Sequence, residues 1–169
     1  MNANKGTVRY LVETGLIAAL YAALTYLCSF FGLAYGSVQF RISEALTLLP
    51  VLTPAAIPGL TIGCLLANLG SIFGVVDIIC GTLATFLAAL CSRLTRQIRI
   101  KGWPVLSALC PVIFNALIIG IEISWFLPEG LTWTGFLASA AGVGLGELVI
   151  CLGLGLPLIR FLEKTSLLK

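Results

Sequence analysis

Three polar side chains stand inside apolar stretches of this chain, where they could bind a ligand. Asn115 and Glu122 lie seven residues apart in one stretch, which places them two helical turns apart on nearly one face. Glu147 lies in another stretch, within the glycine-rich run GVGLGELV. We identify no basic partner for either glutamate within the apolar stretches, whose basic residues lie near their ends. Because an uncompensated charge inside a membrane helix is costly, we expect both glutamates to be functional.

Four further polar residues, Asn68, Glu44, Asp77 and Arg41, lie near the ends of apolar stretches. Each has a purely structural alternative. Arg41 and Glu44 could pair at the start of a helix, and Asp77 could cap one. Asn68 and Asn115 could form hydrogen bonds between helices. Acids outnumber bases among these seven polar residues. The set therefore favours a cationic or hydrogen-bond-donating ligand.

The composition indicates what kind of protein must position these residues. Of 169 residues, 59% are hydrophobic and only 10% are charged, whereas about a quarter of the residues in a soluble domain are charged. This excludes a soluble enzyme, a disordered protein and a nucleic-acid-binding protein, despite the net charge of +3. We predict an all-α polytopic membrane protein that forms a single domain over residues 1–169.

The apolar stretches have the length that crosses a bilayer core of about 30 Å. They predict six transmembrane helices, at residues 10–31, 38–52, 54–73, 75–94, 104–127 and 133–161. The second is short, because 15 residues reach only about 22 Å as a helix. We expect it to cross or nearly cross, with the bilayer thinning to fit it.

The basic residues orient the predicted bundle. With six spans and both termini in the cytoplasm, the outer side has Arg41 alone and the inner side has the other nine cations, namely Lys5, Arg9, Arg93, Arg96, Arg99, Lys101, Arg160, Lys164 and Lys169. This orientation puts most of the polar set in the outer half, with Asn115 and Glu147 near the midplane.

Small residues form a stripe in the first span. Ala18 and Ala22 are four residues apart, as are Ala19 and Ala23. Such spacing lets another helix pack closely, either within this bundle or from a partner protein.

Several common activities lack their sequence motifs here. Histidine is absent, and neither a metal-ligand cluster nor a GxxxxGK[ST] nucleotide-binding motif occurs. We therefore expect neither a metal nor another cofactor, and no enzymatic activity. If the chain transports against a gradient, another subunit must hydrolyse ATP or an ion gradient must drive it.

The chain resembles the QueT family, which is predicted to supply substrate-capturing (S) components of energy-coupling factor transporters for queuosine precursors. The resemblance rests on residues 39–71 (QFRISEALTLLPVLTPAAIPGLTIGCLLANLGS), on GVVDIICGTLATFLAAL at residues 74–90 and on NALIIGIE at residues 115–122. It implies a six-helix S component in a bacterial plasma membrane, with a substrate site near the extracellular side. It also implies that Ala18 and Ala22 dock on a transmembrane T component, and that two ATP-binding-cassette ATPases supply the energy.

The polar set fits the ligand that this resemblance implies, a 7-deazaguanine such as prequeuosine-1. One carboxylate would accept N1–H and the 2-amino group together, and a second would bind the aminomethyl ammonium. We assign these roles to Glu122 and Glu147 in either order, with Asn115 as the amide. Asn68 or a backbone N–H is the alternative donor to O6, and an aromatic side chain would stack on the ring. The aromatic candidates are Phe40, Tyr35 and Trp125.

Three other functions remain open at this stage. The chain could be an S component for another vitamin, such as riboflavin or thiamine. It could also be a stand-alone secondary transporter, although no inverted repeat is evident. A membrane enzyme using two glutamates as acid and base is the weakest reading, because histidine and metal ligands are absent.

Overall fold

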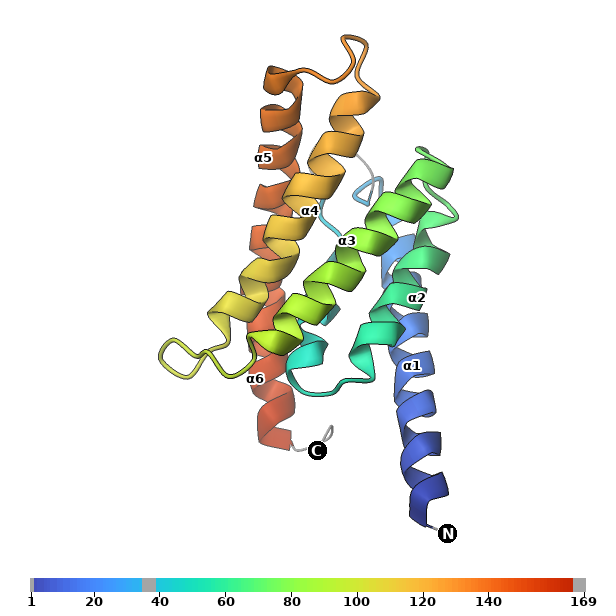
Figure 1. The fold of residues 1–169 in the computed structure, drawn as a ribbon, viewed down its shortest axis with the longest axis vertical. Helices are drawn as coiled ribbons and strands as arrows, with labels where there is room; N and C mark the ends of the chain where they lie inside the picture. The colour runs from blue at the N-terminus through green and yellow to red at the C-terminus, as the bar shows by residue number, and fades with distance from the viewer. Residues whose placement is uncertain (1, 35–38, 166–169) are drawn as a thin grey trace.

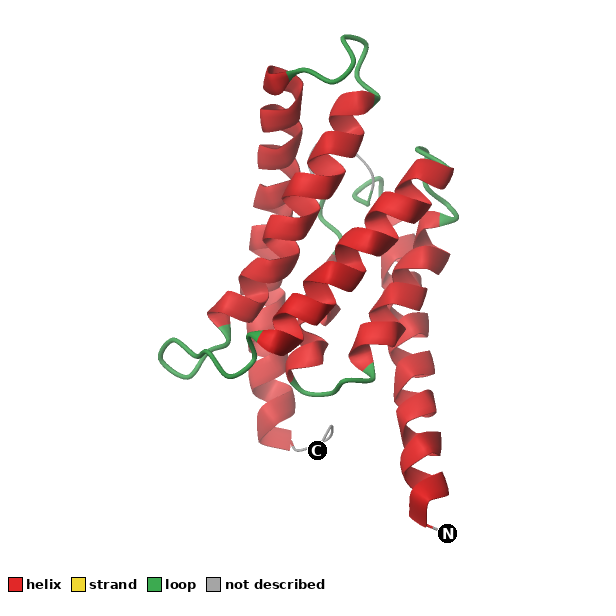
Figure 2. Cartoon of the chain, viewed as in Figure 1, coloured by secondary structure: helices red, strands yellow, loops and turns green. Residues whose placement is uncertain are grey.

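The computed structural model describes residues 2–34 and 39–165. This part of the chain is helical, without a β-strand, as Figure 2 shows. Its elements are α1 (Asn2–Phe30), the 3-10 helix η1 (Ile42–Val51), α2 (Ala56–Asn68), α3 (Val75–Leu94), α4 (Val105–Trp125), α5 (Trp133–Ile150), the π-helical turn η2 (Cys151–Gly155) and α6 (Leu156–Thr165). The predicted all-α class is confirmed.

Four helical segments of the described chain are long and apolar enough to cross a membrane. They are Lys5–Phe30, Val75–Leu94, Val105–Trp125 and the continuous segment Trp133–Thr165, which joins α5, η2 and α6. A helix of about 20 predominantly apolar residues is needed to cross the hydrocarbon core, and each of these segments is at least 20 residues long. They account for the first, fourth, fifth and sixth predicted spans.

The chain runs up and down the bundle so that α1 begins at the same end at which α6 finishes (Figure 1). The loop between α3 and α4 lies at this end too, and Arg99 of that loop pairs with Glu163 of α6 at 2.6 Å. The Arg160 guanidinium also lies 5.6 Å from the centre of the Trp103 ring. Basic side chains far apart in the sequence therefore gather at one end of the bundle, as the positive-inside argument requires.

The second predicted span takes a form that the sequence did not reveal. It is a 3-10 helix of ten residues rather than a 15-residue α-helix, with a length of about 20 Å at 2.0 Å per residue. Every residue from Ser43 to Val51 is buried, and η1 packs against all six α-helices. The expected thinning of the bilayer around this span is therefore unnecessary, because protein surrounds it instead of lipid.

Hydrogen bonds hold η1 in register with α1, to which it runs antiparallel. Ser43 accepts a bond from Thr25 at 2.7 Å, and beyond the end of η1 Thr53 donates to Glu13 at 2.9 Å. At the same end, the Arg93 guanidinium donates to the carbonyl of Pro50 at 2.9 Å. Because a helix leaves its last carbonyls without intrahelical partners, this arginine makes the burial of η1 possible.

In α4, too, a side chain from another helix replaces a missing backbone hydrogen bond. Pro111 is fully buried and has no N–H, so it cannot bond to the carbonyl of Ser107 one turn earlier. Ser92 of α3 donates to that carbonyl at 2.7 Å instead. The proline thus costs no hydrogen bond, and the replacement bond joins α3 to α4.

Glycines set the closest approaches between elements. A Cβ on Gly63 of α2 would lie 2.8 Å from the carbonyl oxygen of Ala18 on α1. A Cβ on Gly146 of α5 would overlap the carbonyl of Gln39, just before η1. The glycine-rich run around Glu147 therefore lets the backbone that leads into η1 approach α5, which brings the polar residues of both segments together.

We expect Gly146→Ala to lower the midpoint of thermal unfolding in detergent. Overpacking a tight site costs about 1–3 kcal/mol, and each kcal/mol corresponds to roughly 2–4 °C for a chain of this size. Gly153→Ala is the matched control, because nothing lies within 4 Å of its added Cβ. Equal melting temperatures of the two variants would contradict this account of the α5 surface.

Candidate functional site

Five charged side chains are buried among the residues that the structure describes. One is a base and four are acids: Arg41, Glu44, Asp77, Glu122 and Glu147. None of them is more than 6% exposed. Since charged side chains are almost never fully buried without a partner, the contacts of each one show what it does.

Arg41 is buried and reaches into the middle of this group. Its Nη2 donates to the Tyr21 hydroxyl at 3.1 Å and to the Asn68 side-chain oxygen at 3.5 Å. Its Nε lies 3.6 Å from Glu44 Oε1. The expected Arg41–Glu44 pair is therefore present, and it is buried. The guanidinium also links α1, the start of η1 and α2.

Glu44 is held from the α1 side. The Tyr21 hydroxyl donates to its Oε1, and Tyr21 itself is fully buried. Glu44 Oε2 is buried without a hydrogen-bond partner among the described residues. One oxygen of this carboxylate thus accepts a hydrogen bond from α1, while the other can still accept one.

Glu147 and Asn115 form a pair across α5 and α4. The Asn115 Nδ2 donates to Glu147 Oε1 at 2.8 Å, and the Cys151 thiol lies 3.6 Å from Glu147 Oε2. The bond fixes the amide orientation, because Asn115 must present nitrogen to the carboxylate. The expected role of Asn115 in joining helices is seen here, and its side-chain oxygen and second N–H can still bind another group.

Glu122 lies seven residues after Asn115 on α4 and differs from the other carboxylates. It is 3% exposed, and neither of its oxygens has a hydrogen-bond partner among the described residues. Electrostatic interactions connect it with Asp77 of α3 and with Arg41. Within the described chain, Glu122 is thus a buried carboxylate with both oxygens unsatisfied, although such a group normally finds a donor.

Asn68 and Asp77 connect α2 to α3. The Asn68 Nδ2 donates to the backbone carbonyl of Asp77 at 3.0 Å, while its oxygen accepts from Arg41. Asp77 lies in the first turn of α3, but the residue at the cap position is Gly74, with φ of 63°. Asn68 therefore acts as a structural link between helices, and Asp77 adds negative charge to the interior.

The three aromatic candidates do not meet around these groups. Trp125, at the end of α4, is 66% exposed, and Phe40 is 38% exposed beside Arg41. Tyr35 lies outside the described residues. The structure instead brings Tyr21 into the cluster, a residue that the sequence analysis missed because it stands in a uniformly apolar stretch.

The alanine stripe on α1 divides between two faces. Ala18 and Ala22 are buried inside the chain, where the backbone of Ala18 packs against Gly63 of α2. Ala19 and Ala23 are exposed, as is Gly15 one turn before Ala19. In the isolated chain, Ala19 and Ala23 are therefore more accessible to a partner than Ala18 and Ala22, to which the resemblance assigned the docking role.

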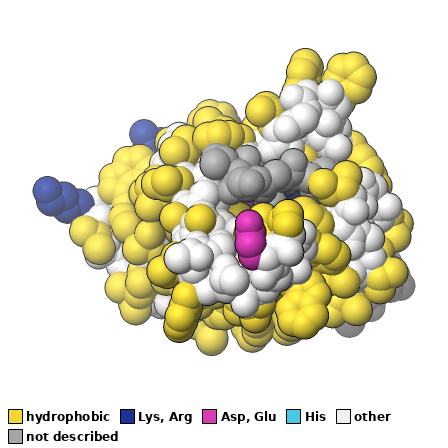
Figure 3. Space-filling view, turned by 90° about the horizontal axis from the view of Figure 1, so that it is seen from above, with side chains coloured by type: hydrophobic (Ala, Val, Ile, Leu, Met, Phe, Trp, Pro, Cys, Tyr) yellow, Lys and Arg dark blue, Asp and Glu magenta, His cyan; other side chains and the backbone are white. Residues whose placement is uncertain are grey.

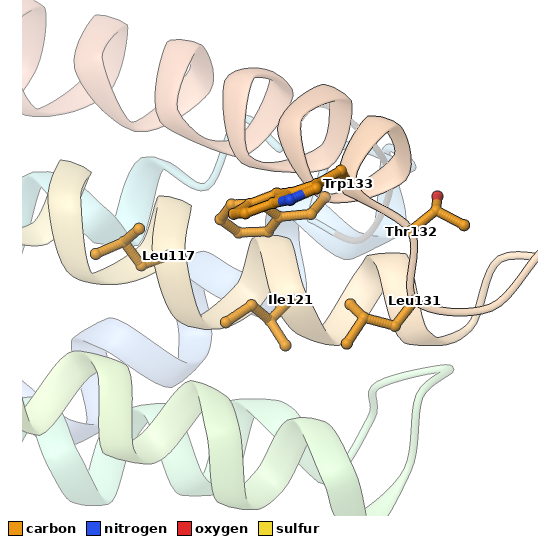
Figure 4. A pocket seen from close by; sticks show the side chains of 6 residues that line it. Leu117, Ile121, Leu131, Thr132 and Trp133 are labelled. Atoms are coloured by element: carbon orange, nitrogen blue, oxygen red, sulfur yellow. The ribbon is translucent and has the colours of Figure 1, made fainter.

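An apolar groove of about 590 Å³ lies between α4 and α5 on the surface of the bundle (Figure 4). Its lining is Leu117, Ile121, Leu131, Thr132, Trp133 and Phe136. Figure 4 shows the Trp133 ring lying along this groove, and no charged residue lines it. A groove of this chemistry suits lipid chains in a membrane protein and does not contain the polar candidates.

The end of the bundle remote from the termini is shown in Figure 3. Hydrophobic side chains occupy much of this face, and an acidic side chain lies near its centre. No group of three or more metal-ligating side chains occurs within residues 2–34 and 39–165.

We expect Arg41→Gln to destabilise the protein by about 3–5 kcal/mol, because it leaves buried acids without their compensating charge. The control is Arg9→Gln. The exposed Arg9 side chain pairs with Glu13 at 2.8 Å, and such surface pairs contribute about 0–1 kcal/mol. Thermal unfolding of both variants in detergent measures the difference. Similar melting temperatures would show that Arg41 does not hold the interior together.

The sequence of this chain matches one protein family and one named relative. The model of the QueT transporter family matches residues 11–164. Over 77 residues, the chain is 38% identical to a protein of Lactococcus lactis subsp. cremoris (strain MG1363) named Queuosine precursor transporter QueT. That match covers 46% of this chain and 45% of the relative, so it spans less than half of either protein. No solved structure matches the chain.

Both names describe transporters, which confirms the resemblance noted in the sequence and the expectation that the chain is not an enzyme. The four membrane-length helices agree with a multi-pass membrane protein. As the family model covers all of the chain except its first ten and last five residues, this protein belongs to the QueT transporter family.

Proposed function

We propose that this chain is the substrate-capturing S component of an energy-coupling factor importer for a queuosine precursor. The single observation that carries the proposal is the buried cluster of four acids around one arginine. An interior with surplus acids favours a ligand that brings positive charge and hydrogen-bond donors. A 7-deazaguanine with an aminomethyl arm, such as prequeuosine-1, brings both.

The Asn115–Glu147 pair can recognise the purine-like edge of this ligand. A carboxylate has about four acceptor sites, so Glu147 can accept further bonds while it holds Asn115. Its bidentate acceptance of N1–H and the 2-amino group would be charge-assisted and planar. The second N–H of Asn115 would then donate to O6. Glu122 supplies the second carboxylate.

The distribution of charge supports an orientation with both termini in the cytoplasm of a bacterium. Basic residues gather at the end where α1 begins and α6 finishes, including Arg99 beside Glu163. In the plasma membrane this end would face the cytoplasm. The buried acids would then open toward the extracellular side, from which an importer captures its substrate.

Energy for uptake would come from partner proteins. The chain contains no nucleotide-binding motif, so we propose that a T component and two ATP-binding-cassette ATPases complete the transporter. The exposed stripe of Gly15, Ala19 and Ala23 on α1 is the contact surface for the T component, because small residues permit close helix packing within a membrane.

Glu147→Gln is expected to weaken binding of 7-aminomethyl-7-deazaguanine at least tenfold. The change removes the charge from two hydrogen bonds, and a hydrogen bond to a charged group contributes about 1.5–3 kcal/mol, while 1.4 kcal/mol corresponds to tenfold. Calorimetric titration of the purified protein measures the loss. Glu163→Gln, at the opposite end of the bundle, is the control and should bind normally.

The same titration tests the proposed function. The wild-type protein should bind a 7-deazaguanine, and mass spectrometry after mild purification should find one bound. A flavin or thiamine in its place would assign the chain to another vitamin. Failure to bind any 7-deazaguanine would refute the proposal.

The docking surface has its own test. Ala19→Leu combined with Ala23→Leu should prevent co-purification with the T component and ATPases, because two bulky side chains would hold the helices apart. Ala138→Leu with Ala141→Leu, at exposed positions on α5, is the matched control. Normal assembly of the α1 variant would move the interface elsewhere.

A further inference from the structure

The buried acids differ in how completely their oxygens are used. Glu147 accepts from Asn115 at 2.8 Å and contacts Cys151, and Glu44 accepts from Tyr21. In contrast, Glu122 is 3% exposed and has no hydrogen-bond partner for either oxygen among the described residues. A buried carboxylate without donors is costly, so its position calls for a group that completes it.

The surroundings of Glu122 favour a cation. Asp77 on α3 interacts with it electrostatically and adds negative charge, while Arg41, the other charged group acting on it, is already engaged by Tyr21, Asn68 and Glu44. A neutral or anionic group placed here would leave this negative charge uncompensated. An ammonium would neutralise it and donate up to three hydrogen bonds.

Glu122 is also at a useful distance from the Asn115–Glu147 pair. Seven residues of α-helix separate it from Asn115, which corresponds to about 10.5 Å along the axis. That separation is comparable to the long dimension of a deazaguanine together with its aminomethyl arm. One turn beyond Glu122, Phe126 meets Phe73 with ring centroids 5.2 Å apart. Phe73 also packs against a buried apolar cluster that includes Ile119 and Ile123, which flank Glu122 on α4. Exclusion of water by such a cluster would strengthen an ion pair.

Resting on the proposed function, we propose that Glu122 is the specificity residue that binds the ammonium of the aminomethyl arm. The Asn115–Glu147 pair then binds the opposite, pyrimidine edge of the base. This assigns the two carboxylates to the two ends of the ligand. It also makes the protein selective for 7-aminomethyl-7-deazaguanine over 7-cyano-7-deazaguanine, because a nitrile has no proton to donate to Glu122.

The test compares these two ligands by calorimetric titration of the full chain in detergent. The wild-type protein should bind the aminomethyl compound at least tenfold more tightly than the cyano compound. Glu122→Gln should reduce this preference to about threefold or less, chiefly by weakening the aminomethyl compound. Glu122→Asp keeps the charge and should retain most of the preference. Glu129→Gln removes an exposed glutamate in the loop after α4 and should leave it unchanged.

The cyano compound serves as the internal control for folding, since its binding does not require Glu122. Equal weakening of both ligands by Glu122→Gln, or an unchanged preference, would overturn the inference while the proposed function stands. Absence of binding of either compound to the wild-type protein would overturn the proposed function, and the inference with it.

Discussion

Arg41 brings a guanidinium into the interior of the bundle, where a tyrosine, an asparagine and a glutamate from three different segments surround it. Burying one charge among four acids is tolerable only when its donors are used and the opposite charges lie close. Arginine suits this position because its planar fork can serve several acceptors at once. The arrangement of α1, α2 and the start of η1 depends on these contacts, since each of these segments provides one of the acceptors.

The helix η1 follows from the same constraint. Glu44 has to reach both Tyr21 and Arg41, so this pass of the chain lies inside the protein. Surrounding helices replace lipid around it, and Arg93 satisfies its last carbonyls. A helix shorter than the bilayer is thereby accommodated without any change in the membrane. Gly146 gives the incoming backbone room beside α5, which places Glu147 near Glu44.

The sequence predicted the helical class, the long spans and the buried polar residues, because hydropathy and the cost of buried charge depend on composition alone. It did not predict which face of a helix packs inward, so Ala18 and Ala19 could not be told apart by their spacing. The charge rule assigned Arg41 to the outer half, but this rule says nothing of the contacts that an arginine makes inside a bundle. Tyr21 gave no signal, since a tyrosine in an apolar stretch reveals its partner only when η1 is placed beside it.

The buried acids differ in how many hydrogen-bond donors the protein supplies to them, and this difference relates stability to function. Groups that hold the scaffold, such as Glu44 and Glu147, have protein donors, whereas Glu122 has none among the described residues. Leaving a carboxylate unsatisfied lowers the stability of the ligand-free protein, and natural proteins retain such groups mainly where function requires them. On the proposed function, a cationic ligand stabilises the protein by supplying the charge and donors that Glu122 lacks. Selectivity then arises because a neutral analogue would leave Glu122 uncompensated.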